Sequence, residues 1–133
     1  MTNVHADVGQ LFAQSTIADP RVSAVMMGQL VRGLGADHVC WGTDAIWTGS
    51  PQWQIEALRR LEIPEELQRK YGFAPLGAAD GKVKTTILGG NNARLYNFKA
   101  EERAALAGDR VAESRVSTRS TGRSAPTSRT DTR

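Results

Sequence analysis

The chain contains one compact apolar run that ends in an acid, Val39-Cys40-Trp41-Gly42-Thr43-Asp44. It carries no charge before its last residue, which is typical of a strand buried on both faces. Upstream, residues 3–9 alternate apolar and polar side chains and predict a short strand closed by Gly9. Between them, Asp19-Pro20 predicts the start of a helix and Gly35 its end. This order predicts one βαβ unit with parallel strands.

The rest of the folded part predicts helices. A second cap-plus-proline start, Ser50-Pro51, opens a helix whose buried stripe is Ile55, Leu58 and Leu61. A shorter helix begins at Pro64, with its acidic residues at the positive end of the helix dipole. We then expect an irregular segment over 73–81, a helix over 82–88, a break at Gly89-Gly90, and a last turn over 92–96 capped by Asn91.

Charge and composition divide the chain in two. Residues 1–107 carry 11 of the 17 Lys and Arg and 11 of the 14 Asp and Glu, so this part is neutral. The whole net charge of +3 therefore lies in residues 108–133, where Ser, Thr and Arg dominate. Such a segment buries too little apolar surface to offset its ordering entropy. We expect a folded domain over 1–107 and a disordered tail over 108–133.

The same numbers exclude several classes of protein. A neutral folded part gives no electrostatic reason to expect a nucleic-acid or anionic-membrane partner. No apolar run approaches the roughly 20 residues that span a bilayer, and the N-terminus lacks the pattern of a signal peptide. Cys40 stands alone, so no intrachain disulfide is possible, and we expect a buried, unreactive thiol. The sequence thus indicates a cytoplasmic protein.

Asp44 is the candidate catalytic residue, and its position is the reason. Ligands of α/β folds bind outside the carboxyl ends of the parallel strands, where Asp44 would lie. If the strand alternates regularly, Cys40 and Gly42 share a face with Asp44, and such small residues leave room for an ion or a substrate. A carboxylate there can ligate a divalent cation or act as a general base. The alternative is a structural Asx-turn that caps the following loop.

Three stretches in register resemble the metal-dependent amidohydrolase superfamily, in particular its amidohydrolase-related branch of hydrolases and decarboxylases. Residues 35–52, with their Gly42-Thr43-Asp44, resemble the eighth barrel strand and its following loop. Ile87-Leu88-Gly89-Gly90-Asn91-Asn92-Ala93-Arg94-Leu95-Tyr96 is similar to the closing signature of the family, and residues 3–7 resemble its seventh strand. The likeness covers about residues 3–98.

The resemblance implies a fold and a chemistry. The chain would be the C-terminal fragment of a (β/α)8 TIM barrel, about strands seven and eight with their helices, and about half as long as a whole barrel of roughly 250 residues. Asp44 would be the metal-site and general-base carboxylate, beside a divalent metal, zinc by default. Trp47, in the loop after the eighth strand, would line the pocket for a small-molecule substrate.

The chain also departs from the family. It has two histidines and no His-x-His pair, whereas the family builds its metal site largely from histidines. His5 and His38 are expected to be structural, and Arg94 to pin the last helix through an ion pair. One aspartate cannot hold a catalytic zinc, so the chain by itself is expected to be inactive. Two alternatives stay open: a truncated remnant, and a small non-catalytic interaction module that pairs through its open sheet edges.

Overall fold

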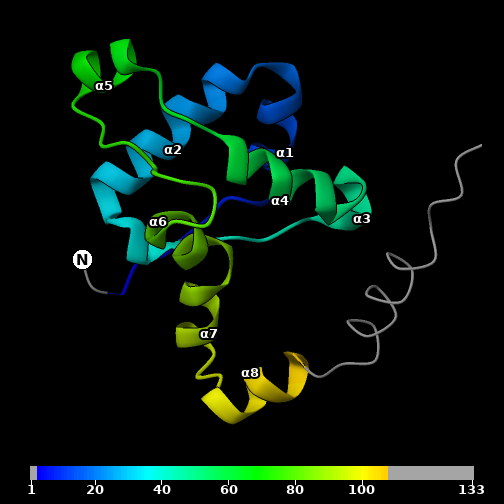
Figure 1. The fold of residues 1–133 in the computed structure, drawn as a ribbon. Coiled ribbons are helices and arrows are strands. Elements are labelled where there is room, and N and C mark those ends of the chain that lie inside the picture. Colours follow the sequence, from blue (N-terminus) through cyan, green and yellow to red (C-terminus); the bar gives the residue numbers. More distant parts are fainter. Residues whose placement is uncertain (1–2, 108–133) are drawn as a thin grey trace, which may run out of the picture. The chain divides into compact units, whose positions relative to one another are not determined.

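The structure is a computed structural model that describes residues 3–107. It is a mostly helical α/β arrangement around a small two-stranded parallel sheet (Figure 1). In chain order the elements are β1 (Ala6–Asp7), α1 (Gly9–Ala18), α2 (Pro20–Leu34), the 3-10 turn η1 (Ala36–His38), β2 (Val39–Cys40), α3 (Ala45–Thr48), α4 (Pro51–Arg60), α5 (Glu65–Tyr71), α6 (Lys82–Thr85), the π-helical η2 (Thr86–Gly90), α7 (Asn91–Leu95) and α8 (Ala100–Ala107).

Residues up to Asn97 form one compact unit, and α8 belongs to a second one. In the second unit the Lys99 backbone N–H donates to Glu102 Oε2 over 2.8 Å, which holds the first turn of α8. The predicted disordered tail, 108–133, lies outside the described residues. Among residues 3–107, none of the helices combines the length and the apolar character that a membrane crossing requires.

The predicted βαβ unit is present. β1 and β2 pair in parallel, with Ala6 opposite Val39 and Asp7 opposite Cys40, and Val8 N–H donates to the Cys40 carbonyl over 3.2 Å. Both strands are much shorter than the alternation predicted. The reason is that the chain turns into a helix at Gly9, so residues beyond Cys40 have no ladder partner.

The connection between the strands holds two helices where the sequence predicted one. Helix α1 buries Phe12 and Ala13 against the core. Two adjacent residues do not form the apolar stripe with helical spacing from which a helix is predicted. Helix α2 begins as predicted, with the Asp19 carboxylate accepting from the Arg21 backbone N–H over 2.9 Å. It ends at Gly35, whose φ of +88° favours glycine.

The face that α2 buries is made largely of small residues. Ala24, Met27 and Gly28 are buried, whereas Val22 is 53% exposed. A Cβ atom on Gly28 would lie 2.5 Å from the Phe73 ring, so the glycine lets the ring lie against the helix backbone. The tight approach of α2 to Phe73 depends on this missing side chain.

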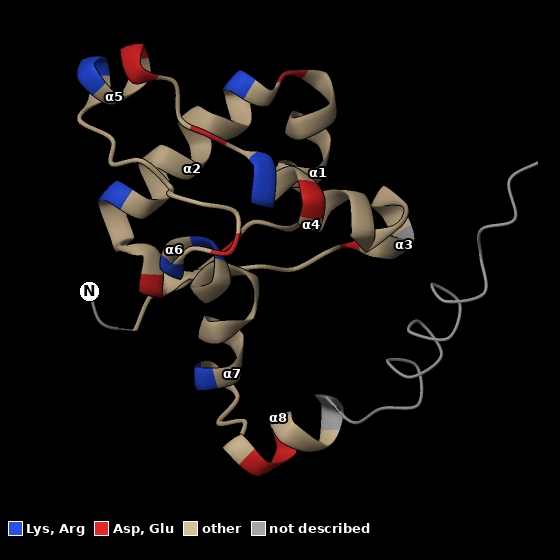
Figure 2. Ribbon diagram, in the orientation of Figure 1, with Lys and Arg blue, Asp and Glu red and all other residues tan. Residues whose placement is uncertain are grey.

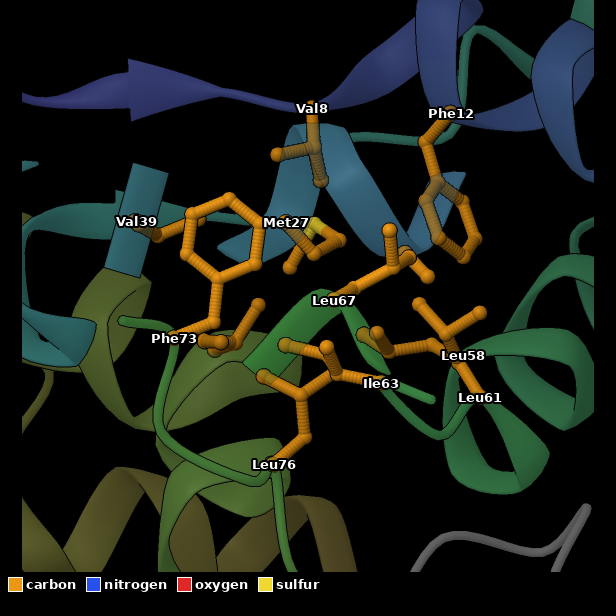
Figure 3. Close-up of a cluster of buried hydrophobic side chains, with 12 residues drawn as sticks. Val8, Phe12, Met27, Val39, Leu58, Leu61, Ile63, Leu67, Phe73 and Leu76 are labelled. Atoms are coloured by element: carbon orange, nitrogen blue, oxygen red, sulfur yellow. The ribbon is translucent and has the colours of Figure 1, made fainter. Parts of the chain in front are cut away.

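One apolar core fills the space between the sheet and the helices (Figure 3). Val8 and Val39 reach it from the strands, and Leu58 from α4 is fully buried, as the stripe predicted. Each such side chain contributes about 1.5–3 kcal/mol by leaving water. In α5 the acidic residues lie in the first turn and the basic residues in the last, as the helix dipole favours (Figure 2).

Two predictions for the last helical stretch are wrong. Residues 73–81 are irregular as expected, but Gly89-Gly90 does not break the helix: α6, η2 and α7 run on without interruption, and Gly90 has φ −60° and ψ −41°. Asn91 is a helical residue with φ −69° and ψ −45°, so it is not a cap. A continuous helix presents Ile87 and Asn91, four residues apart and both buried, to the rest of the unit.

Candidate functional site

Two carboxylates lie at the carboxyl ends of the parallel strands. Asp7 is the last residue of β1, and Asp44 follows the end of β2 in the segment that leads to α3. Both side chains turn toward the first residues of α1, which starts directly after β1. The candidate site is therefore the region where Asp7, Asp44 and the N-terminus of α1 meet.

Asp44 binds α1 across a long sequence separation. Its Oδ2 accepts a hydrogen bond from the Gln10 backbone N–H over 2.7 Å, and the residue is exposed to solvent. Within residues 3–107, Oδ1 of Asp44 has no hydrogen-bond donor. The carboxylate thus satisfies an otherwise free N–H of the first helical turn and keeps one oxygen available.

The Asx-turn alternative for Asp44 is not what the structure contains. The Asp44 side chain makes no capping hydrogen bond to α3; the Thr43 hydroxyl accepts from the Ala45 N–H instead, over 3.1 Å. Asp44 has φ +45° and ψ +36°, a left-handed conformation that Asp tolerates better than most residues. This backbone turn ends the strand direction and aims the carboxylate back toward α1.

A buried glutamine fixes the segment that carries Asp44. Gln54 of α4 is fully buried, and its Nε2 donates to the Thr43 carbonyl over 3.0 Å and to the Thr48 hydroxyl over 2.7 Å. The Thr48 hydroxyl in turn donates to the Thr43 carbonyl over 2.8 Å. The backbone beside Asp44 is therefore anchored from the core of the molecule.

Asp7 is a member of the site that the sequence analysis did not identify. Its Oδ1 accepts from the Gly9 backbone N–H over 3.1 Å, next to the N–H that Asp44 binds. A Cβ atom on Gly42 would lie 2.7 Å from Asp7 Oδ1, and one on Gly9 would lie 2.7 Å from Asp44 Oδ2. Two glycines therefore make room for the two carboxylates. The sequence signal that could have identified Asp7 is an acid at the end of a predicted strand, two residues before Gly9.

Trp47 lies on α3, the element that Asp44 begins. Its side chain is 82% exposed, so it projects into solvent beside the carboxyl end of β2. Helix α3, which carries Trp47, packs on α1. Pocket lining by Trp47 remains a prediction.

The two histidines lie together at the amino ends of the strands, away from Asp7 and Asp44. His5 precedes β1 and His38 precedes β2, and their rings stack with centroids 5.0 Å apart. His38 Nδ1 lies 3.2 Å from Asp37 Oδ1, and this contact is the main reason why the pKa of Asp37 falls below its usual value. Neither imidazole joins Asp44, which agrees with the structural role expected for both.

The family-like closing segment covers the outer edge of β2. The Asn91 side-chain amide donates to the carbonyls of Ala36 and Val39, over 2.8 and 2.7 Å, and Asn92 donates to Trp41 over 2.9 Å. Together these donors satisfy backbone carbonyls at the start of η1, in β2 and directly after β2.

Arg94 extends the same contact by one further bond. Its guanidinium donates to the backbone carbonyl of Asp37. The predicted ion pair is absent from the described residues, so Arg94 pins the helix through a carbonyl rather than through a carboxylate. The Asp37 carbonyl, in η1, accepts the bond from Arg94, whereas the Asp37 carboxylate faces His38.

Cys40 is 7% exposed. Burial raises the pKa of its thiol above the usual value, and the nearby Asp7 carboxylate adds to the rise. A raised pKa lowers the fraction of reactive thiolate at neutral pH. This environment agrees with the unreactive thiol expected from the sequence.

The described residues supply too few ligands for a catalytic zinc, which needs about three protein ligands and a water. Over residues 3–107 no three His, Cys, Asp or Glu side chains come together as a possible metal-binding group. Asp7 and Asp44 are two carboxylates, each already bonded to a backbone N–H of α1. A zinc ion at this end of the sheet would need ligands from other residues.

Comparison with protein-family models, with curated proteins and with solved structures finds no match to this chain.

Proposed function

We propose that the chain is the C-terminal portion of a metal-dependent amidohydrolase-type (β/α)8 barrel, a hydrolase or decarboxylase of small molecules, with Asp44 as its strand-eight carboxylate. One observation carries the proposal: Asp44 is exposed just beyond the carboxyl end of a strand in a parallel βαβ unit. Active sites of barrel enzymes lie at this end of the strands.

The position of the closing segment supports the proposal. The residues that resemble the closing signature of the family pack on β2, where Asn91 and Asn92 bind the carbonyls of Val39 and Trp41. Two stretches separated by about fifty residues, each of which resembles the family, are thus in contact. A chance resemblance of either stretch alone would not require this.

The hydrogen bonding of Asp44 suits a proton acceptor. Oδ2 is held by the Gln10 N–H, which fixes the orientation of the carboxylate, and Oδ1 has no donor within the described residues. The backbone turn at Asp44 is anchored by Gln54 from the core. An oriented carboxylate with a free oxygen can accept a proton from water or substrate, or bind a cation.

The proposal assigns the other ligands to sequence outside residues 3–107. A divalent cation, zinc by default, would polarise water or substrate in the complete protein, and Asp44 would supply one of its protein ligands. We expect residues 1–133 alone to hold no catalytic metal and to be inactive. Metal-dependent turnover by the purified chain would contradict this part of the proposal.

The DNA upstream of Met1 gives the first test. An in-frame extension of roughly 200 residues with a His-x-His pair is expected if the chain completes a barrel of roughly 250 residues or more. A stop codon followed by frame-shifted similarity would favour the truncated remnant and would overturn the enzyme proposal for this chain.

Substitution in such a longer gene product gives the second test. Asp44→Asn should abolish hydrolysis or decarboxylation while the thermal unfolding curve changes little, because Asp44 is exposed. Asp37→Asn is the matched control: Asp37 is an exposed carboxylate at the opposite end of the strands and should leave turnover intact. Full activity of the Asp44→Asn variant would remove Asp44 from the mechanism.

A further inference from the structure

Helix α1 begins on a residue whose side chain cannot cap it. The N-cap is Val8, which is apolar, 2% exposed and part of the core. Its carbonyl accepts from the Phe12 N–H over 3.0 Å, the first bond of the helix. The side chain of an N-cap Ser, Thr, Asp or Asn normally accepts one of the free N–H groups of the first turn, and valine has no atom for this. These N–H groups therefore need acceptors from other residues.

Two carboxylates at the ends of the strands supply acceptors for two consecutive N–H groups. Asp7 Oδ1 accepts from the Gly9 N–H over 3.1 Å, and Asp44 Oδ2 accepts from the Gln10 N–H over 2.7 Å. Asp44 thus takes the place of an N-cap side chain, although it lies 34 positions after Gln10. The helix dipole also favours a carboxylate at this end. The orientation of the Asp44 carboxylate therefore depends on the position of the first turn of α1.

Gly9 is the residue that both carboxylates contact. Asp7 binds its N–H, and a Cβ atom on Gly9 would lie 2.7 Å from Asp44 Oδ2, so Asp44 lies against the same residue. Within residues 3–107 the Gln10 N–H is the sole hydrogen-bond donor to the Asp44 carboxylate. A shift of Gly9 would therefore displace the one donor that orients Asp44.

On its other side the Asp7 carboxylate lies against the segment that leads to Asp44. A Cβ atom on Gly42 would lie 2.7 Å from Asp7 Oδ1 and 2.9 Å from Oδ2, so both oxygens are close to the Gly42 backbone. Burial is the main reason why the pKa of the Cys40 thiol is raised, and the charge of Asp7 is the second. Asp7 thus lies between the first turn of α1 and the end of β2, and it fixes the spacing between them.

We propose that Asp7 is a positioning residue for Asp44. By holding the Gly9 N–H it fixes the first turn of α1, which keeps the Gln10 N–H on Asp44 Oδ2 and leaves Oδ1 free for a proton or a cation. The use of this orientation in catalysis rests on the proposed function, but the orientation itself can be measured in the chain as it stands. Since β1 and β2 are neighbours, a further strand beside β1 would leave these contacts in place.

Amide proton shifts of the isotopically labelled 133-residue chain test the positioning. An amide that donates to a carboxylate changes its shift when that carboxyl group is protonated, so the Gln10 amide should follow Asp44 as the pH falls. Asp7→Ala removes the acceptor for the Gly9 N–H and should reduce this response of Gln10 by at least about half. Asp7→Asn keeps an acceptor oxygen and should preserve the response. An unchanged Gln10 response in Asp7→Ala overturns the proposal.

Two controls separate positioning from general damage. Asp37→Ala removes an exposed carboxylate at the amino ends of the strands and should leave the Gln10 response unchanged. The Val8 amide, which donates to Cys40, should stay protected from hydrogen exchange in every variant, which shows that the sheet is intact.

Hydrogen exchange of the unmodified chain decides the question if Asp7→Ala does not fold. The protection factors of the Gly9 and Gln10 amides should agree within about threefold, because one opening of the first turn releases both. A Gln10 amide protected more than about tenfold better than Gly9 would show that Asp44 keeps its place without Asp7, which overturns the proposal.

Turnover of a longer gene product separates this inference from the proposed function. There Asp7→Ala should lower kcat about tenfold with KM nearly unchanged, because a small misplacement of Asp44 slows the chemical step, and Asp7→Asn should recover most of the loss. Full turnover of Asp7→Ala beside an inactive Asp44→Asn variant overturns the positioning and leaves the proposed function intact. An active Asp44→Asn variant removes the proposed function, and the Gln10 response then decides the positioning by itself.

Discussion

At the carboxyl ends of the strands side chains accept hydrogen bonds from backbone N–H groups, whereas at the outer edge of β2 side chains donate hydrogen bonds to backbone carbonyls. At the carboxyl ends, Asp7 and Asp44 accept hydrogen bonds from the free N–H groups that begin α1. Along the outer edge of β2, Asn91 donates to the carbonyl of Val39, and Asn92 donates to that of Trp41 directly after the strand. In both places side chains complete backbone hydrogen bonding, and those of Asp44, Asn91 and Asn92 come from distant parts of the sequence.

The two regions differ in burial, and burial separates stability from function. Asn91 is 1% exposed, so its bonds cannot be replaced by water. Asp44 is exposed and keeps one oxygen free, so losing it costs little stability and the free oxygen can meet a ligand. The buried amides are therefore expected to matter most for folding, the exposed carboxylate least, and four predictions compare such contacts by their effect on stability.

The largest effect is expected at Asn91. Asn91→Ala removes one buried and one partly buried hydrogen bond and leaves the carbonyls of Val39 and Ala36 without this donor, at a cost of about 3 kcal/mol in the free energy of unfolding. Asn92→Ala removes one bond from a half-buried residue and should cost about 1 kcal/mol. Urea unfolding measures both values. Equal costs would mean that burial does not separate these two amides.

Glycine substitutions test the packing around Asp44. Gly9→Ala places a Cβ atom 2.7 Å from Asp44 Oδ2, so the carboxylate must move away from the Gln10 N–H. We expect a loss of about 1–2 kcal/mol in the free energy of unfolding. Gly33→Ala in α2 is the matched control, because nothing lies within 4 Å of its added Cβ. That change should stabilise the helix by about 0.5–1 kcal/mol. A neutral Gly9→Ala would show that the Asp44 contact is loose.

Asp44 itself should matter little for stability. Asp44→Asn keeps an oxygen acceptor for the Gln10 N–H and an acceptable left-handed backbone, but loses the charge at the start of α1. The expected cost is about 0.5 kcal/mol after allowing for solvent screening. It should shrink further in about 0.5 M salt, because the Debye length becomes shorter. Thermal unfolding at low and high salt measures it. A cost as large as that of Asn91→Ala would make Asp44 a structural residue.

The smallest effect concerns Lys84 of α6, a charged donor to a carbonyl near the end of α4. Lys84 is 1% exposed, and its Nζ donates to the Arg59 carbonyl over 2.7 Å. Burial lowers the pKa of Lys84 below 10.5, because the charged amine is poorly solvated there. The unfolded chain then binds more protons than the folded chain between the lowered pKa and 10.5, so this group adds stability as pH rises through that window.

Lys84→Met should remove that rise while changing stability at neutral pH by less than about 1 kcal/mol. Urea unfolding of both proteins from pH 7 to about 10.5 measures the difference. A parallel pH dependence in the two proteins would show that Lys84 does not titrate in this range.

The sequence predicted the parts of the fold that depend on neighbouring residues. Asp19-Pro20 and Ser50-Pro51 start helices α2 and α4, and both caps accept a backbone N–H two residues later. Gly35 ends α2 because a positive φ is easy for glycine. The order of strand, helix and strand fixed the parallel pairing, because a crossover of this length leaves no other direction.

The sequence did not predict contacts between distant residues. Gly89-Gly90 normally weakens a helix, but burial of Ile87 and Asn91 on one face outweighs that local preference and keeps the helix continuous. Likewise, Asp7 gave no more local signal than any acid before a turn. Its place in the candidate site depends on α1 starting at Gly9, a helix that the apolar spacing did not indicate.

The sequence by itself therefore determined the starts of α2 and α4, the end of α2 at Gly35 and the parallel pairing of the strands, since these depend on atoms a few residues apart or on the order of the elements. It also indicated that Asp44 follows a buried strand. Only the tertiary structure decided that the Asp44 carboxylate binds α1, that Asp7 lies beside the same helix end, and that Asn91 binds the Val39 carbonyl. The Asp44 and Asn91 contacts join residues more than thirty positions apart, and packing of the whole unit selects them.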